Sequence, residues 1–342
     1  MLMQPITLPI QPESKRHVFI RRAAQLCVIF FVTLMAVACE KQSVSTASLK
    51  LGTNVWPGYE PLYLARSLGS YDNAITLVEY SSSSQVIRAL RNGLIDAAAI
   101  TLDEALILLE QQQDLQVILV TDFSNGADAI IGQSDISSLE EISGKIVGVE
   151  NTALGAYMLS RALDLCKIKK SSIQIKSLEI DEHEKAFSNN LVDIIVTFDP
   201  VRTKLLKTGA SELFTSKQLP GEIVDIIVIR KEVIPVFIEN ITILKEGWFH
   251  ALRYMKENPE KAYRILSSRL KLPVPDVKDS FEKLTLPSRK ENIELIGKKN
   301  NSTLIQTVKK LSAVMMENKL LKTPIDPLSL FAIDPTDNDF SQ

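Results

Sequence analysis

Short apolar runs rich in β-branched residues alternate along the chain with segments in which apolar residues recur every three or four positions. The first pattern predicts strands buried in a sheet, and the second predicts amphipathic helices. Strands are expected at residues 49–55, 74–80, 94–100, 115–120, 129–132, 145–149, 173–180, 191–198, 213–215 and 223–230. Helices are expected between them, so the fold class is α/β, with a mostly parallel sheet covered by helices on both faces.

Two departures from this rhythm divide the chain. The segment DFSNGAD at residues 122–128 interrupts the first series, and a second series begins with the strand expected at 145–149. After residue 236 the pattern is helical, with one apolar stripe at residues 241, 244, 248, 252 and 255. The pattern therefore predicts two α/β units and a helical C-terminal part.

The segment LKLGTNVWPGYEPLYLARSLG at residues 49–69 predicts a strand, a tight turn and a helix. Pro57 and Gly58 suit a type II turn, in which the glycine adopts a positive φ. This arrangement puts Trp56 and Tyr59 beside a helix start at the carboxyl end of a strand, where open α/β sheets bind ligands. Trp56 suits an anchor of the hydrophobic core equally well, so both interpretations stay open.

Loops at the carboxyl ends of the other strands supply further candidates, because parallel strands end at one edge of a sheet. The serines at 81–84 precede a helix and offer amide and hydroxyl donors to an anion, although capping by one serine explains them as well. Thr152 allows the same two interpretations. The expected ligand-binding residues are Trp56, Tyr59, Glu60, Ser82, Ser83, Thr101, Asp103, Asn125, Asp128, Glu150, Asn151, Thr152, Asp181, Phe198, Asp199 and Arg202.

Acidic residues outnumber basic ones in these loops, where Arg202 is the obvious base. Many acids at helix starts serve only the helix dipole. Several carboxylates in a desolvated cleft nevertheless disfavour a free anion and favour an amine-bearing or zwitterionic solute. Candidate carboxylates for that contact are Glu60, Asp103, Asp128, Glu150 and Asp199.

The sequence offers no set of residues for catalysis or for a cofactor. The run Asp181-Glu182-His183-Glu184 lies on an expected helix, where adjacent side chains point apart and cannot share one metal ion. The chain has no phosphate-binding loop and no serine or cysteine spaced for a catalytic triad. A net charge of −2, without a basic stretch in the folded part, argues against a nucleic-acid protein. We expect no metal, no cofactor and no enzymatic activity.

The N-terminus is typical of a targeting signal. Two pairs of basic residues precede an apolar run at 23–38, which ends in small residues before Cys39. The run is short for a membrane span, although an uncleaved anchor is the alternative. Cys39 resembles the lipid-modified cysteine of a bacterial lipoprotein, so residues 1–38 are expected to be a signal peptide and 39–48 a polar tether. Cys166 then remains as a single buried thiol without a disulfide partner.

Several segments together resemble one protein family. They are WPGYEPLYLA at 56–65, IDAAAITLDEAL at 95–106, SNGADAII at 124–131, VGVENTALGAYML at 147–159, DEHEKAF at 181–187, DIIVTFDPVR at 193–202 and QLPGEIVDIIVIR at 218–230. They resemble the solute-binding proteins of bacterial ABC importers, in the branch of the nitrate, sulfonate, taurine and thiamine-pyrimidine binders. A related fungal fold makes the thiamine pyrimidine with a cysteine-rich motif, which this chain lacks.

The resemblance implies a type II periplasmic-binding-protein architecture. Two lobes, residues 49–131 with 230–342 and residues 132–229, would be joined by two hinge crossovers with the ligand cleft between them. It implies a monomer on the periplasmic side of the cell envelope, anchored by lipid, that captures a small solute by lobe closure. Its partners would be the permease subunits and cytoplasmic ATPase of the importer. A lipoprotein that reports the solute to a membrane receptor, or a binder of sulfonate-like or nitrate-like anions, are the alternatives.

Overall fold

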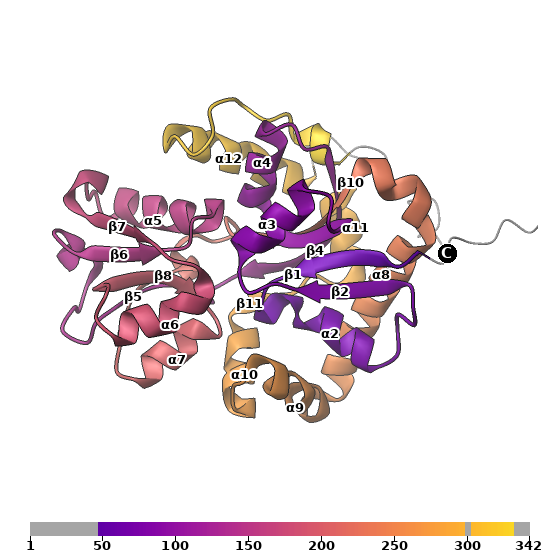
Figure 1. Ribbon diagram of the computed structural model, residues 1–342, viewed down its shortest axis with the longest axis horizontal. Helices are drawn as coiled ribbons and strands as arrows, with labels where there is room; N and C mark the ends of the chain where they lie inside the picture. The colour runs from indigo at the N-terminus through magenta and orange to yellow at the C-terminus, as the bar shows by residue number, and fades with distance from the viewer. Residues whose placement is uncertain (1–46, 298–301, 332–342) are drawn as a thin grey trace, which may run out of the picture. The chain divides into compact units, whose positions relative to one another are not determined.

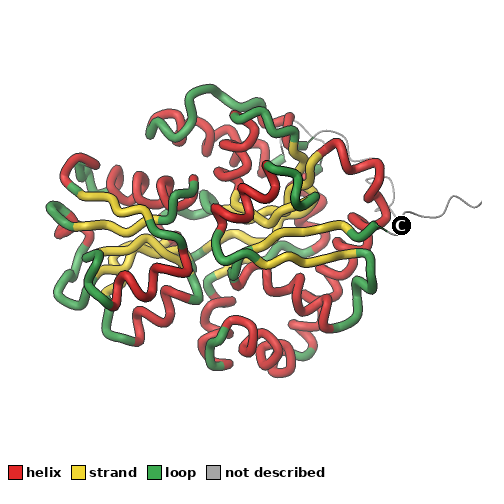
Figure 2. The backbone as a smooth tube through the Cα atoms, viewed as in Figure 1, coloured by secondary structure: helices red, strands yellow, loops and turns green. Residues whose placement is uncertain are grey.

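The computed structural model describes residues 47–297 and 302–331, all within one compact unit that begins at Ala47. The expected signal peptide, the lipidation site Cys39 and most of the expected tether lie outside the described residues. Figure 1 shows two sheets, each flanked by helices, and Figure 2 shows their strands as two separate groups. We call the six-stranded sheet with its helices the first lobe and the five-stranded sheet with its helices the second lobe.

The first lobe is built on the strand order β11-β4-β10-β3-β1-β2. In chain order these strands are β1 (Leu49–Thr53), β2 (Ile75–Glu79), β3 (Ala97–Thr101), β4 (Leu115–Ser124), β10 (Val224–Arg230) and β11 (Leu284–Thr285). The helices that accompany them are α2 (Glu60–Ser67), α3 (Ser83–Arg91), α4 (Leu102–Glu110), α8 (Ile234–Glu257), α9 (Pro259–Leu270), α10 (Val274–Glu282), α11 (Arg289–Ile296) and α12 (Thr303–Glu317). The apolar stripe expected after residue 236 lies on α8, where Trp248 is completely buried.

The second lobe has the strand order β7-β6-β8-β5-β9. Its strands are β5 (Asp128–Gly132), β6 (Ile146–Val149), β7 (Gln174–Ser177), β8 (Ile194–Phe198) and β9 (Ser211–Thr215). Its helices are α5 (Ala153–Leu165), α6 (Ile180–Ser188) and α7 (Val201–Lys207). The α/β fold with two sheets is thus confirmed, and most elements lie within two residues of their expected positions.

Two strands, β5 and β10, belong to a different sheet from the one that the expected lobe boundaries give them. The expected division put most of β5 in the first lobe and most of β10 in the second. Instead β5 pairs antiparallel with β8 and β9, and β10 pairs antiparallel with β3 and β4. The chain therefore crosses between the lobes at 125–127 and again at 216–223. Each crossing strand enters its sheet antiparallel, so both sheets are mixed, with four parallel and five antiparallel pairings among the described strands.

Residues 57–59 form a short 3₁₀ helix, η1 (Pro57–Tyr59), in place of the expected type II turn. Gly58 has no positive φ; it is required because a Cβ would lie 1.9 Å from Asp122 Oδ2 and 2.4 Å from Trp56 Nε1. The close approach brings the loop after β1 against the carboxyl end of β4. This glycine therefore serves packing at the cleft.

Gly58→Ala is expected to push Asp122 and Trp56 apart and to weaken solute binding, at a stability cost of about 1–3 kcal/mol for the overpacked site. Gly69→Ala is the matched control, since Gly69 has a φ of +72° but open space around its Cβ position. That control should lower stability through backbone strain and leave the affinity unchanged. Calorimetric titration and thermal unfolding of both variants test this; equal affinities in the two would contradict it.

Candidate ligand-binding cleft

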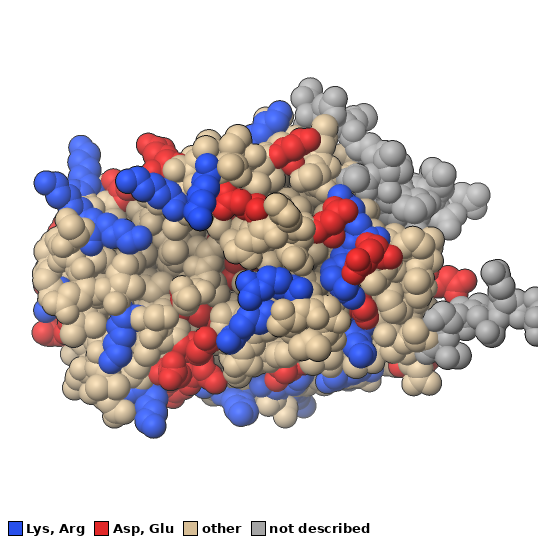
Figure 3. Space-filling view, turned by 45° about the horizontal axis from the view of Figure 1, so that its top comes forward, with Lys and Arg blue, Asp and Glu red and all other residues tan. Residues whose placement is uncertain are grey.

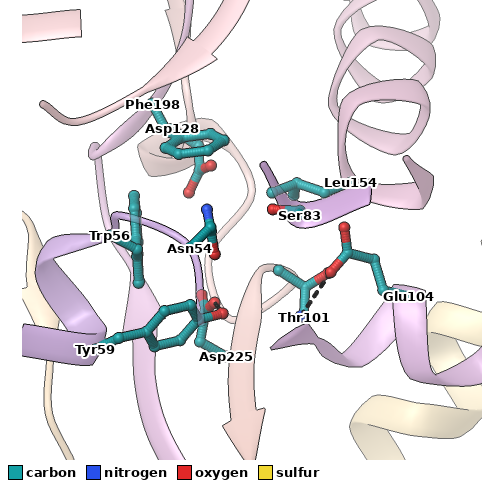
Figure 4. A pocket seen from close by; sticks show the side chains of 10 residues that line it. All are labelled: Asn54, Trp56, Tyr59, Ser83, Thr101, Glu104, Asp128, Leu154, Phe198 and Asp225. Atoms are coloured by element: carbon teal, nitrogen blue, oxygen red, sulfur yellow. Dashed lines mark hydrogen bonds between the residues drawn. The ribbon is translucent and has the colours of Figure 1, made fainter. Parts of the chain in front are cut away.

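A cavity lies between the lobes, where the carboxyl ends of β1, β3 and β8 meet the two crossovers. About 250 Å³ of space, part of it open to solvent, lies between its lining atoms. We call it the acidic cavity; its lining residues are Asn54, Trp56, Tyr59, Ser83, Thr101, Glu104, Asp128, Leu154, Phe198 and Asp225 (Figure 4). Its walls combine aromatic faces with a few polar groups, as small-molecule sites do.

Aromatic side chains from both lobes form one wall of the acidic cavity. The rings of Trp56 and Phe198 meet edge to face, with centroids 5.6 Å apart and planes at 85°. Trp56 Nε1 donates to Asp122 Oδ2 at 3.2 Å, and the Tyr59 hydroxyl donates to Asp225 Oδ1 at 2.5 Å. Carboxylates thus fix the orientation of both first-lobe aromatic residues. Such faces can cover an apolar group or a cation.

Glu104, Asp128 and Asp225 bring three carboxyl groups to the acidic cavity, from α4, β5 and β10. The backbone amide of Thr101 donates to Glu104 Oε2 at 3.1 Å, as part of the capping box of α4. Glu104 Oε1 and Asp128 Oδ2 are buried and have no hydrogen-bond partner among the described residues. Figure 4 shows Asp128 between the Phe198 ring and Asn54, and Glu104 on the opposite side of the cavity.

Two further buried acids interact electrostatically with this group. Asp103 and Asp122 are buried, and each leaves one carboxyl oxygen without a partner in the described part of the chain. The described lining contains neither lysine nor arginine. Elsewhere on the molecule, charges of both signs are interspersed, as the face in Figure 3 shows. Several buried carboxyl groups therefore surround the cavity, and no lysine or arginine lies on its described wall to pair with them.

Burial dominates the titration of these acids. Desolvation, with the charge of Asp103 added, raises the pKa of Glu104 to about 8. Desolvation also raises the pKa values of Asp122 and Asp128 to about 7, and each of these two acids feels at least one further carboxylate. The pKa of Asp225 is raised for the same reasons. A cation placed among these groups would favour their ionised forms and remove the repulsion between them.

A second cavity, of about 260 Å³, adjoins the first and lies in the second lobe. We call it the histidine cavity; its lining residues are Asp128, Glu150, Thr152, Leu154, Gly155, Met158, His183, Val196, Thr197 and Phe198. His183 is completely buried, with Nδ1 3.2 Å from Thr197 Oγ1 and with no partner for Nε2 in the described structure. Burial lowers the pKa of His183 to about 4, so its ring is neutral near pH 7.

The serine loop is occupied by carboxylates of the protein itself. Ser82 caps α3 by accepting from the amide of Gln85 at 3.4 Å. The Ser84 amide donates to Glu150 Oε1 at 3.2 Å, and the Ser84 hydroxyl donates to Glu179. Both acids come from the second lobe, so they bridge the lobes at the start of α3. Internal carboxylates thus hold both donors of Ser84, whereas Ser83 lines the acidic cavity.

The structure brings together about half of the expected ligand residues. Those lining the acidic cavity are Trp56, Tyr59, Ser83, Thr101, Asp128 and Phe198, and those lining the histidine cavity also include Glu150 and Thr152. Ser82 and Asp103 are buried near the cavities without lining them. Asn125, Asn151 and Asp181 are exposed.

The other expected charges are paired elsewhere. Glu60 Oε2 accepts from Arg269 at 2.8 Å, and the Arg269 guanidinium lies 3.4 Å from the centroid of the Tyr63 ring. Asp199 accepts from the amide and hydroxyl of Thr203 at 3.1 and 2.7 Å. Arg202 pairs with Asp199 and Glu212. None of Glu60, Asp199 and Arg202 lines either cavity, because each is held by a structural partner.

Sequence reasoning did not select Asn54, Glu104, Leu154 and Asp225 as ligand residues. Glu104 is part of the capping box of α4, so its position at a helix start is explained without a ligand. Asp225 interrupts the apolar run IVDIIVIR of β10, and an acid in the middle of a buried strand was the available signal.

The two tryptophans give a direct test of the aromatic wall, since Trp56 lines the cavity and Trp248 lies in the core. Saturating solute should change the fluorescence of Trp56, and Trp56→Ala should weaken binding by about 1–3 kcal/mol. Trp248→Phe is the control: it should lower stability but keep the fluorescence response. Normal affinity in folded Trp56→Ala would show that this ring only packs.

The described residues were compared with the requirements of a membrane-spanning helix and of a metal site. In residues 47–297 and 302–331, no helix is both long and apolar enough to cross a bilayer. Within the same ranges, no group of three or more His, Cys, Asp or Glu side chains is arranged to hold a metal ion.

Comparison with known proteins identifies a family and several structural relatives. The NMT1-like family matches residues 42–267. The taurine-binding periplasmic protein of Escherichia coli is 23% identical over 158 residues, which cover 45% of this chain and 49% of that protein. The chain thus spans about half the length of this curated relative.

Solved structures share the fold at low identity. The alkanesulfonate-binding protein of Xanthomonas axonopodis pv. citri, bound to MOPS, has a TM-score of 0.69 at 17% identity, covering 82% of this chain and 96% of that one. The aliphatic sulphonate binding protein of Escherichia coli has a TM-score of 0.66 at 19% identity, covering 83% and 97%. The nitrate-binding protein of Synechocystis has a TM-score of 0.65 at 14% identity, covering 82% and 83%. These similarities establish the two-lobed periplasmic-binding-protein fold.

Proposed function

The chain belongs to the NMT1-like family, and on that basis we propose that it is an extracytoplasmic solute-binding protein of an ABC importer. In this proposal a small amine-bearing solute binds between the lobes and is delivered to a membrane permease. The periplasmic-binding fold and the position of the acidic cavity between two lobes support this role, because lobe closure is the usual way such folds bury a ligand. No catalytic step is part of the proposal.

One observation carries the choice of solute: Glu104, Asp128 and Asp225 line the cavity, and no lysine or arginine lies beside them on the described wall. A carboxylate buried without a cation is costly, and a positively charged solute would offset that cost. An anionic solute would add to the repulsion. Ser84 adds to this argument, because its amide and hydroxyl already donate to Glu150 and Glu179.

A thermal-shift screen against amines, amino-acid derivatives, pyrimidines, sulfonates and nitrate tests the choice of solute. A ligand at 100 times its Kd stabilises the folded state by about 2.7 kcal/mol, which is easily measured. We expect amine-bearing compounds to raise the melting temperature and simple sulfonates and nitrate to leave it unchanged. Stabilisation by sulfonate or nitrate alone would overturn the proposal in favour of an anion binder.

The delivery step needs a separate test, since a sensor lipoprotein would bind its solute by the same closure. Cells that lack the protein should lose uptake of the solute identified in the screen, and restoring the gene should restore uptake. Normal uptake with a lost transcriptional or signalling response would favour the sensing alternative.

We further propose that Cys39 anchors the mature protein to the membrane through lipid, following the layout of residues 1–39. Mass spectrometry of protein purified from membranes should find an N-terminus at Cys39 carrying acyl chains. Cys39→Ser should release the protein from the membrane fraction. Residues 1–38 still attached to the mature chain would exclude this proposal.

A further inference from the structure

The acidic cavity and the histidine cavity are continuous in their lining. Asp128, Leu154 and Phe198 belong to both. Figure 4 shows these three side chains around the upper part of the acidic cavity, and all three belong to the second lobe. The two cavities are therefore neighbours, with these three side chains at their common boundary.

The part of the histidine cavity away from this boundary carries polar and acidic side chains. His183 is completely buried there, and its Nε2 has no partner in the described structure. Glu150 is buried beside it and uses Oε1 to accept from the Ser84 amide. The described lining of this cavity, like that of the acidic cavity, contains neither lysine nor arginine. Buried polar atoms of this kind are normally satisfied by a partner.

At the boundary between the two cavities, apolar side chains flank the shared carboxylate of Asp128. Leu154, Met158, Val196 and Phe198 line the histidine cavity, and Leu154 and Phe198 continue into the acidic cavity. Apolar side chains favour contact with methylene groups and offer nothing to a polar middle section. Each cavity thus has carboxylate acceptors on its wall, and the apolar side chains of Leu154 and Phe198 border both.

We propose that the two cavities together bind one linear solute that has an amino group at each end and a methylene chain between them. The inference rests on the proposed function and deepens it. One ammonium group would lie among Glu104, Asp128 and Asp225, and the second would donate to His183 Nε2 and to the carboxylates of Glu150 and Asp128. An ω-amino acid fits less well, because its carboxylate would face Glu150 and Asp128.

A homologous series tests this inference by calorimetry on the full mature chain. The probes are straight-chain diamines of three to six carbons, with monoamines and ω-amino acids of the same lengths. The best diamine should bind roughly tenfold or more tighter than the monoamine of its length, and the ω-amino acid should bind weaker than both. Equal affinity of diamines and monoamines overturns the two-ended site but leaves the proposed amine binding intact. Failure of every amine to bind overturns the proposed function itself.

Variants of the histidine cavity give an independent test. His183→Asn and Glu150→Gln should lower the affinity for the best diamine roughly tenfold and leave the monoamine affinity within about twofold. Glu150→Gln keeps an oxygen that accepts from the Ser84 amide, so it preserves the lobe contact if His183→Asn fails to fold. Asp181→Asn, at an exposed acid on α6, is the matched control. Equal losses for diamine and monoamine in either folded variant would overturn the inference.

Discussion

Asp128→Asn is expected to weaken binding of an amine-bearing solute by about 2–5 kcal/mol, the loss seen when one partner of a buried charge pair is truncated. Asp128 starts β5, lines both cavities and holds Oδ2 without a partner in the described structure. The substitution keeps the shape of the side chain and removes its charge, so a bound ammonium group loses its central counter-ion. Calorimetric titration of the wild type and the variant measures the change.

The control for this prediction is Asp181→Asn, which makes the same chemical change at an exposed position. It should bind like the wild type. The stability of Asp128→Asn is a second discriminator: the variant loses a carboxyl group whose pKa burial raises to about 7, so it should be at least as stable as the wild type near pH 8. An Asp128→Asn protein that binds normally would show that Asp128 is not a ligand residue.

The solute-free protein is expected to lose stability as the pH rises from 6.5 to 8. In the folded state the pKa of Glu104 is about 8 and those of Asp122 and Asp128 are about 7, against ordinary values of 4.5 and 3.8. Over this range the folded protein holds more protons than the unfolded chain, so the free energy of unfolding falls as pH rises. These three groups alone give a loss on the order of 3 kcal/mol, since each pKa unit corresponds to about 1.4 kcal/mol. Glu60 and Glu150, whose pKa burial also raises to about 7, add to the loss.

The pH range is chosen to keep His183 out of the measurement. Its folded pKa of about 4 lies below the ordinary value of 6.5, so His183 contributes stability above pH 6.5 that is lost as the pH falls toward 4. Denaturant titration at pH 6.5, 7.2 and 8 isolates the carboxyl groups. Glu104→Gln should flatten the dependence, and a saturating amine should raise stability most at pH 8. Stability that rises from pH 6.5 to 8 would show that these acids are ionised without penalty in the folded protein.

The same proton balance makes solute binding depend on pH. An ammonium ion binds to the ionised acids, so binding near pH 7 should release protons to the buffer and strengthen as the pH rises. Calorimetry in buffers of different ionisation enthalpy counts those protons. The stability loss and the gain in affinity share one cause, the buried acids of the cleft.

Local patterns in the sequence determined the elements and the type of the fold. Apolar runs and helical stripes depend only on residues a few positions apart in the sequence. They located both α/β series and the buried Trp248 of α8. The same reasoning put Trp56 and Tyr59 in a loop at the carboxyl end of β1, where the cavity lies. The excess of acids was also visible, because composition needs no tertiary structure.

Only the tertiary structure decided which acids line the cavity together and which charged side chains are paired elsewhere in the protein. The expected charges Glu60 and Asp199 are held by Arg269 and Thr203, whereas Asp225 reaches the cavity from a strand read as core. Tyr59 and Asp225 are 166 positions apart, and Glu60 and Arg269 are 209 apart. The sheet to which β5 and β10 belong was equally hidden, because a strand buried on both faces has the same apolar pattern in either sheet. Contacts across such separations depend on how the lobes pack, and no local pattern records them.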